Sequence, residues 1–259
     1  MSAVLEVEEL AVAFGGVKAV DGVTFTLDAG RALGVVGPNG SGKTTCFNAL
    51  CGVVRATGRV TVAGEALPPG QPGRARRLGI LRVYQAPQAF PGLLAWENVA
   101  LARPDRRGTG LGSACVARWR MARHERAREV AARDALARVG LAGAGDRPTE
   151  ALTYGQLRLL DLARAIAGEP LVLLLDEPTA GLNEVETEQM VAAVAALRVD
   201  RPDLALAVID HKISVIDALC DRVLALDLGR VVVEGAPDEV WAHEQVLDAY
   251  LGGSGARAT

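Results

Sequence analysis

The sequence has little of what marks disulfide-stabilised, membrane-spanning or nucleic-acid-binding proteins. It has four cysteines in 259 residues, with no CxxC pair or other metal-ligand spacing, which predicts reduced, structural thiols. Its longest apolar runs, such as 171–175 and 204–209, fall far below the roughly 20 residues that a spanning helix needs. The formal net charge of -3 gives no basic footprint for nucleic acid. The cysteines are Cys46, Cys51, Cys115 and Cys220.

A secretory leader is also missing from residues 1–10. Glu6, Glu8 and Glu9 lie there, where a leader would carry basic residues ahead of an apolar stretch. Together with the reduced thiols, this predicts a cytoplasmic protein. What the sequence does have is apolar content, because 50% of its residues are hydrophobic. A core of that size predicts one large domain, with or without a subdomain.

Two kinds of apolar segment occur along the chain. Short β-rich runs separated by turn residues predict antiparallel strands in the N-terminal part. Continuous apolar runs at 171–175 and 204–209 enclose a helical pattern at 184–197, as a parallel βαβ crossover would. The pattern therefore predicts an α/β protein. The short β-rich runs are residues 4–7, 23–27 and 59–63.

The middle and the end of the sequence predict further elements. Residues 96–140 are rich in Ala, Arg and Glu and have no strand pattern, which favours a helical subdomain. Its arginines alternate with acidic residues, so a solvated helix face is favoured over a phosphate or lipid contact. Residues 223–226 and 231–233 predict a hairpin, and 238–251 a terminal helix. The arginines are Arg118, Arg120, Arg123, Arg126 and Arg128.

One Gly-rich segment combines a motif with suitable flanks. Residues 37–44 read GPNGSGKT, which fits GxxxxGK[ST], between a strand-like run at 32–36 and a helical pattern at 42–50. Glycines let successive N–H groups curl around phosphate oxygens, and the helix start adds a positive dipole end. We expect Lys43 to hold phosphate charge and Thr44 to ligate Mg²⁺. A chance Gly-rich turn, the plainer interpretation, would not have both flanks.

Two carboxylates follow the apolar run at 171–175. A strand buried on both faces ends at the carboxyl edge of its sheet, which is where doubly wound folds place the phosphate loop. Asp176 is expected to order Mg²⁺ through water, and Glu177 to take a proton from attacking water. The plainer interpretation, acids that only cap a strand end, loses weight beside a phosphate loop.

With further motifs in the same order, the sequence resembles ATP-binding subunits of ABC transporters over nearly its whole length. Residues 152–156, LTYGQ, resemble the LSGGQ signature, and 158–167 the helix that follows it. Residues 180–183 match the D-loop, Gln85 the Q-loop, and His211 the switch histidine. Phe14 stands where the family places an aromatic under adenine. Taken singly, Gln85 could be a solvated loop residue, His211 a strand cap, and Phe14 a core aromatic.

The resemblance implies a phosphate-loop NTPase fold with a RecA-like core and an N-terminal antiparallel β-subdomain. A helical signature subdomain, about 92–168, would be inserted in a single domain of residues 1–252, with a flexible tail at 253–259. The implied catalytic residues are Glu177, His211 and Gln85. Thr44, Gln85 and Asp176 would hold the metal. The implied ATP-binding residues are Phe14, Asn39, Gly40, Ser41, Gly42, Lys43, Thr44 and Thr45.

The family's mechanism implies a dimer with ATP and Mg²⁺ between the subunits. One chain carries one phosphate loop and one signature, and the partner's signature completes each ATP site. The helix end after the signature would contribute to phosphate binding. Closing and opening of the dimer would move membrane permease subunits. The signature residues are Thr153, Tyr154, Gly155 and Gln156, and the D-loop residues are Gly181 and Asn183.

Four positions depart from the family pattern. Thr153 replaces Ser and keeps the hydroxyl, whereas Tyr154 replaces the first Gly of the signature with a bulky ring. Asn183 stands where many relatives have Asp, and Glu184 where many have Pro. These departures concern the polar contacts of the signature and D-loop and leave the phosphate loop intact.

Within the family, residues 14–20, the Tyr-containing signature and residues 250–252 look like branched-chain amino acid uptake ATPases of bacteria. Lipopolysaccharide-export ATPases share Asp210 and His211 and are the alternative. A DNA-maintenance ATPase would need a sustained heptad run, which the sequence lacks. The resemblance implies a second ABC ATPase subunit, identical or related, permease subunits on the inner face of the membrane, and an extracytoplasmic substrate-binding protein.

Overall fold

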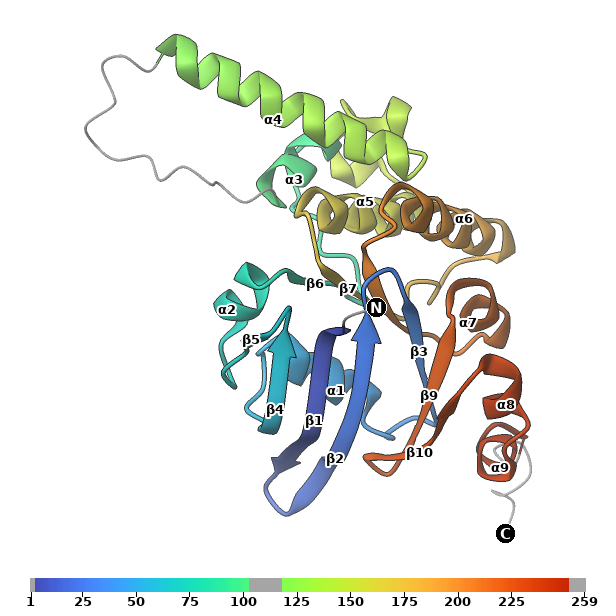
Figure 1. Ribbon diagram of the computed structural model, residues 1–259. Coiled ribbons are helices and arrows are strands. Elements are labelled where there is room, and N and C mark those ends of the chain that lie inside the picture. The colour runs from blue at the N-terminus through green and yellow to red at the C-terminus, as the bar shows by residue number, and fades with distance from the viewer. Residues whose placement is uncertain (1–2, 103–117, 252–259) are drawn as a thin grey trace. The chain divides into compact units, whose positions relative to one another are not determined.

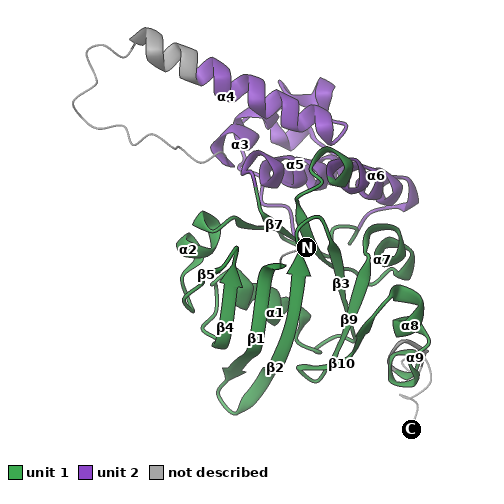
Figure 2. Cartoon of the chain, in the orientation of Figure 1, with its two compact units in different colours: residues 1–85, 170–180, 198–259 green, residues 86–169, 181–197 purple. Residues whose placement is uncertain are grey.

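The computed structural model describes residues 3–102 and 118–251 and divides into two compact units (Figures 1 and 2). Unit 1 consists of residues 1–85, 170–180 and 198–259, and unit 2 of residues 86–169 and 181–197. Cys115 and the expected tail at 253–259 lie outside the described residues. None of the described helices is both long enough and apolar enough to cross a membrane.

An antiparallel sheet in unit 1 has the strand order β2-β1-β4-β5. β1 (Ala3–Phe14) and β2 (Val17–Asp28) form a long hairpin, and β4 (Thr57–Val62) pairs with β1 and with β5 (Glu65–Ala66). The expected N-terminal antiparallel β-subdomain is therefore present.

The first strand is longer than the sequence predicted, because a bulge interrupts its alternation. Pairing with β2 shifts register between Val7 and Leu10, and Glu9 adopts a φ of 49°. The bulge leaves Glu8 and Glu9 both exposed in succession, which hides the period of two that marks a strand. Leu10 is buried again, so the strand continues to the hairpin turn.

A second sheet of unit 1, mostly parallel, has the order β10-β9-β3-β8-β7-β6. β3, β7 and β8 are buried at every position, as expected for central parallel strands. The chain from β7 to the parallel β8 runs through α6 (Glu184–Asp200), which confirms the predicted βαβ crossover. The strands are β3 (Ala32–Val36), β6 (Ile80–Val83), β7 (Val172–Asp176), β8 (Ala205–Ile209), β9 (Arg222–Asp227) and β10 (Arg230–Gly235).

Five helices lie in the described part of unit 1, and one sequence prediction among them was wrong. The predicted helix at 238–251 is two helices, because α8 ends before Ala242 and the amides of Val246 and Leu247 bond to His243. Val240 and Val246 are both buried, although a continuous helix would direct residues six apart to different faces. The helices are α1 (Lys43–Leu50), α2 (Pro72–Arg77), α7 (Ile213–Leu219), α8 (Pro237–Trp241) and α9 (Glu244–Leu251).

The described part of unit 2 contains helices and one isolated β-bridge, between Leu94 and Pro148. α3 (Ala95–Ala102), α4 (Arg118–Arg138) and α5 (Tyr154–Ala167) pack against one another, which agrees with the helical pattern predicted for 96–140. Short 3-10 turns at 142–144 and 149–151 connect α4 to α5. Arg126 and Arg128 of the predicted solvated face are exposed. The side chains of Arg118, Arg120 and Arg123 lie outside the described residues.

Candidate functional site

The loop at 37–44 joins the end of β3 to the start of α1, and its glycines are required by close backbone approaches. Gly37 has a φ of 142° and Gly42 a φ of 102°. A Cβ added at Gly37 would lie 2.0 Å from the carbonyl oxygen of Leu226, and one at Gly42 would lie 2.3 Å from that of Ala19. Only glycine fits at both positions, so the loop keeps its backbone close to the neighbouring strands.

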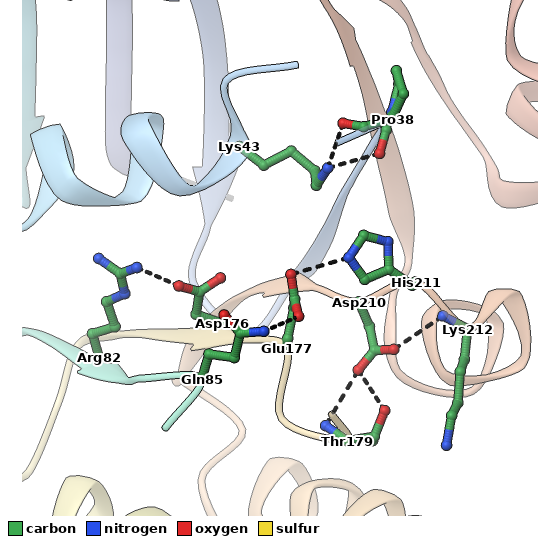
Figure 3. A network of polar contacts seen from close by, with 11 residues as sticks. Pro38, Lys43, Arg82, Gln85, Asp176, Glu177, Thr179, Asp210, His211 and Lys212 are labelled. Atoms are coloured by element: carbon green, nitrogen blue, oxygen red, sulfur yellow. Dashed lines mark hydrogen bonds and ion pairs between the residues drawn. The ribbon is translucent and has the colours of Figure 1, made fainter. Parts of the chain in front are cut away.

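Lys43 directs its side chain back into this loop. Its Nζ donates to the carbonyl oxygens of Gly37 and Pro38, at 2.7 and 2.9 Å (Figure 3). Burial lowers the pKa of Lys43, and the charges of Glu177 and Asp176 oppose that shift. The ammonium group is therefore placed between the loop and the two carboxylates.

The loop has the donors that a phosphate group requires. Ser41 Oγ is buried and has no hydrogen-bond partner among the described residues. The first N–H groups of a helix have no partner within it, so the start of α1 adds further donors. Asn39, Gly40 and Thr44 are exposed at the same loop, and Thr45 is half-buried. An unpartnered hydroxyl, a glycine cradle and a helix start together fit the phosphates of ATP.

The three residues expected to be catalytic meet beyond β7. Gln85 Nε2 donates to Glu177 Oε2 at 2.7 Å, and His211 Nε2 lies 3.0 Å from Glu177 Oε1 (Figure 3). Glu177 adopts a φ of 47°, and its amide donates to the carbonyl of Ile209 at 2.8 Å. This left-handed conformation is uncommon outside glycine and turns the side chain off the strand toward Gln85 and His211.

Asp176, at the end of β7, offers one oxygen that fits a metal site. The carboxylate is almost fully buried, and Arg82 pairs with its Oδ2. The other oxygen, Oδ1, is buried without a hydrogen-bond partner among the described residues. A carboxylate oxygen in that condition fits Mg²⁺ or a water bound to it. Thr44 supplies a hydroxyl, and Gln85, whose nitrogen is bonded to Glu177, retains its amide oxygen.

Asp210 and Thr179 also belong to this site, and the sequence analysis did not predict them as site residues. Asp210 Oδ2 accepts from the hydroxyl and the amide of Thr179, at 2.7 and 3.4 Å, and Oδ1 accepts from the amide of Lys212 at 3.0 Å. These bonds tie the segment that carries His211 to the turn after Glu177. The sequence pattern could have identified Asp210, because this residue directly follows a buried apolar run and precedes His211.

Phe14 lies at the end of β1 with 55% of its surface exposed. The interpretation of Phe14 as a core aromatic is therefore wrong. An exposed ring at a hairpin end is available for stacking on a base, which is the role implied by the family resemblance.

The signature residues form the start of α5 in unit 2. Thr153 is the N-cap, and its Oγ1 accepts from the amide of Gln156 at 3.3 Å, while Gln156 Oε1 accepts from the amide of Thr153 at 3.1 Å. Gly155 is buried, and a Cβ there would lie 2.5 Å from Glu186 Oε1. The Thr153 hydroxyl proton remains available for donation, whereas the Gln156 oxygen is used in the cap.

The departures in the signature and D-loop have local explanations. The Tyr154 ring packs on Gly181, where an added Cβ would lie 3.1 Å from its Cε1. Gly181 has a φ of 76°, which favours glycine. Asn183 accepts from the amide of Glu186 at 2.9 Å and Glu186 accepts from the amide of Asn183 at 3.2 Å. Asn183 therefore caps α6, and the side-chain oxygen of Asn caps a helix as well as a carboxylate oxygen of Asp does.

Comparison with known proteins gives consistent results. The family model described as ABC transporter matches residues 20–180. The branched-chain amino acid transport ATP-binding protein BraF of Pseudomonas aeruginosa is 33% identical over 251 residues, covering 96% of this chain and 98% of that protein. LivG of Escherichia coli, with the same description, is 32% identical over 249 residues, covering 96% and 97%.

Solved structures agree with these relatives. The ADP conformation of MJ1267, an ATP-binding cassette of an ABC transporter, has a TM-score of 0.82 at 26% identity and covers 97% of this chain and 100% of that one. A nucleotide-free cassette of an ABC transporter has a TM-score of 0.82 at 26% identity, covering 96% and 99%.

Proposed function

The chain belongs to the ABC transporter family as an ATP-binding subunit, and from that premise we propose that it drives import of branched-chain or similar amino acids. Like other members, it is an ATPase whose hydrolysis of ATP is coupled to transport. The family membership rests on the match to residues 20–180 and on relatives that align over almost the whole chain. The observation that carries the substrate proposal is the similarity to BraF and LivG.

Nucleotide binding is assigned to the loop at 37–44. Its backbone N–H groups and the start of α1 surround phosphate oxygens, and Lys43 supplies the cation that balances the β- and γ-phosphates. Thr44, Asp176 and Gln85 would hold Mg²⁺, which when bound would neutralise charge on the γ-phosphate. Phe14 stacks on the adenine.

The hydrolytic step is assigned to Glu177. Each carboxylate oxygen has two lone pairs, so Glu177 can accept a proton from water while it keeps its contacts to Gln85 and His211. Those two contacts fix the carboxylate in one orientation, and His211 Nε2 lies on the Oε1 side. A base held in this way orients the attacking water toward the phosphate bound at Lys43.

The complete ATP site requires a second ABC ATPase subunit, identical or related. Thr153, Tyr154, Gly155 and Gln156 contact the nucleotide of the partner, and Gly181 and Asn183 lie in the D-loop that borders it. The cap at Thr153 supports this assignment, because it uses the amide of Gln156 and leaves the Thr153 hydroxyl proton free to be donated to an anion. The subunit binds permease subunits at the inner face of the membrane, and an extracytoplasmic binding protein delivers the substrate.

Uptake by cells tests the substrate proposal. Deleting the gene should reduce uptake of radiolabelled leucine, isoleucine or valine, and the wild-type gene should restore it. A copy encoding Lys43→Ala should fail to restore uptake, because the loop then lacks its cation. Unchanged uptake together with an outer-membrane defect would contradict amino acid import and favour a lipopolysaccharide-export ATPase.

A further inference from the structure

Arg82, on β6, is a buried cation beside the end of β7. Its side chain is 3% exposed, and β6 pairs with β7 in parallel, with Arg82 opposite Leu174. The guanidinium pairs with Asp176 Oδ2 (Figure 3). Its Nη1 donates to Asn48 Oδ1 on α1 at 2.6 Å. One planar group therefore connects the strand-end carboxylate to the helix that follows the phosphate loop.

Two aromatic rings restrict the guanidinium further. Its central carbon lies 4.7 Å from the centroid of the Tyr84 ring and 5.8 Å from that of the Phe47 ring. Stacking of a planar cation on aromatic faces is favourable, and Arg suits this geometry better than Lys. With two rings beside its central carbon and two nitrogens bonded to Asn48 and Asp176, the Arg82 side chain has little freedom to reorient.

The pairing is selective for one oxygen of Asp176. Arg82 occupies Oδ2, whereas Oδ1 is buried and has no hydrogen-bond partner among the described residues. A carboxylate held through one oxygen cannot rotate without breaking that bond, so the direction of the other oxygen is fixed as well. Partners of this kind orient metal ligands in many proteins.

We infer that Arg82 is a positioning residue for magnesium, holding Asp176 so that Oδ1 faces the Mg²⁺ of bound Mg-ATP. The inference rests on the proposed ATP site. Asn48 takes part by holding the guanidinium from the side of α1. A purely structural ion pair would stabilise the fold equally with and without Mg²⁺, whereas a positioning role makes the effect depend on the metal.

The test compares nucleotide affinity with and without Mg²⁺. The dissociation constant of ATP is measured by calorimetry in excess Mg²⁺ and in EDTA, for the wild type, Arg82→Met and Asn48→Ala. We expect the gain in affinity that Mg²⁺ provides to fall by about 10–100-fold in Arg82→Met, as is usual when a partner of a metal ligand is removed. Asn48→Ala should also reduce the gain in affinity that Mg²⁺ provides. Its affinity for ATP in EDTA should equal that of the wild type, because the substitution removes no charge.

Arg198→Met is the control, because it removes a different ion pair of unit 1, the partly buried one to Asp221 at 2.8 Å, by the same Arg-to-Met change. Its Mg²⁺-dependent gain should equal that of the wild type. Thermal melts establish that each variant is folded. If Arg82→Met does not fold, the Mg²⁺-dependent gain of Asn48→Ala tests the inference by itself. If the folded variants keep the wild-type gain in affinity on adding Mg²⁺, the positioning role of Arg82 is wrong and the proposed ATP site stands. Absence of any gain in the wild type overturns both this inference and the proposed ATP site.

Discussion

At the scale of single residues, Glu177 combines an unusual backbone with a fully oriented carboxylate. Its left-handed φ of 47° costs of the order of 1–3 kcal/mol in a residue other than glycine. Gln85 and His211 contact one carboxylate oxygen each. Strain of this kind persists where the surroundings enforce it, and here it directs the side chain toward the loop that carries Lys43.

Replacing Glu177 by Gln keeps the size of the side chain and removes the group that accepts a proton. We expect Glu177→Gln to slow ATP hydrolysis by about 10²–10⁴-fold, because that is the usual contribution of a general base. Binding of ATP should be retained, since Lys43 and the loop are untouched. Phosphate release measures the rate, with Glu188→Gln on an exposed position of α6 as the control. Near-normal turnover would show that another group is the base.

The described cysteines should be unreactive in the folded protein. Burial raises the pKa of Cys46 to about 12, of Cys51 to about 11 and of Cys220 to about 12. The thiolate is the reactive form, so almost none is present at about pH 8. A Cys115→Ser variant should therefore resist iodoacetamide until denatured, as judged by intact mass. Full labelling under native conditions would contradict the buried positions of these thiols.

At the scale of elements, two helices of unit 2 begin with reciprocal caps. Thr153 and Gln156 cap α5, and Asn183 and Glu186 cap α6. Each pair satisfies two backbone N–H groups that would otherwise lack partners at a helix start. The caps fix the backbone of the signature and of the D-loop, which are the segments assigned to the partner's nucleotide.

The cap on α6 gives a prediction for a position where the sequence departs from its family. Asn183→Ala should destabilise the protein by about 0.5–2 kcal/mol, because the amide of Glu186 loses its acceptor. Asn183→Asp should be nearly neutral, because Asp and Asn cap helices equally well. The midpoint of urea denaturation, followed by circular dichroism, measures both. Equal midpoints for the wild type and Asn183→Ala would refute the capping role.

At the scale of the whole molecule, the arrangement of motifs supports the proposed association of two subunits. The chain has one phosphate loop, in unit 1, and one signature, in unit 2. The family's ABC ATPases act as dimers with permease subunits, and the proposed site is completed by the signature of a second subunit. Nucleotide between two subunits stabilises the dimer through linked binding, and hydrolysis removes that stabilisation.

Blocking hydrolysis should therefore trap the dimer. In Glu177→Gln, ATP should produce a stable dimer in size-exclusion chromatography, whereas Lys43→Ala should give none, because the phosphates lose their cation. The measurement is made on the chain alone and with a co-expressed related ABC ATPase, so that a mixed dimer is also detected. A Glu177→Gln protein that stays monomeric with ATP in both samples would argue against the nucleotide-bridged dimer.

The sequence by itself determined the features that depend on neighbouring residues. The spacing of the loop at 37–44 specifies a phosphate cradle, because successive backbone groups and the following helix form it locally. Buried apolar runs specify β7 and β8 and therefore the sheet edge where Asp176 and Glu177 emerge. The remaining site residues followed from the order of family motifs, since Gln85 and His211 are unremarkable on their own.

Tertiary structure decided what depends on pairing between distant segments. The extent of β1 depends on a bulge against β2, and the break between α8 and α9 depends on burying Val240 and Val246 together. No pattern in the sequence distinguishes Arg82 from the other arginines. Only the parallel pairing of β6 with β7, and the approach of Asn48 on α1, make it a buried partner of Asp176. Contacts between residues far apart in sequence leave no local pattern, so the fold alone reveals them.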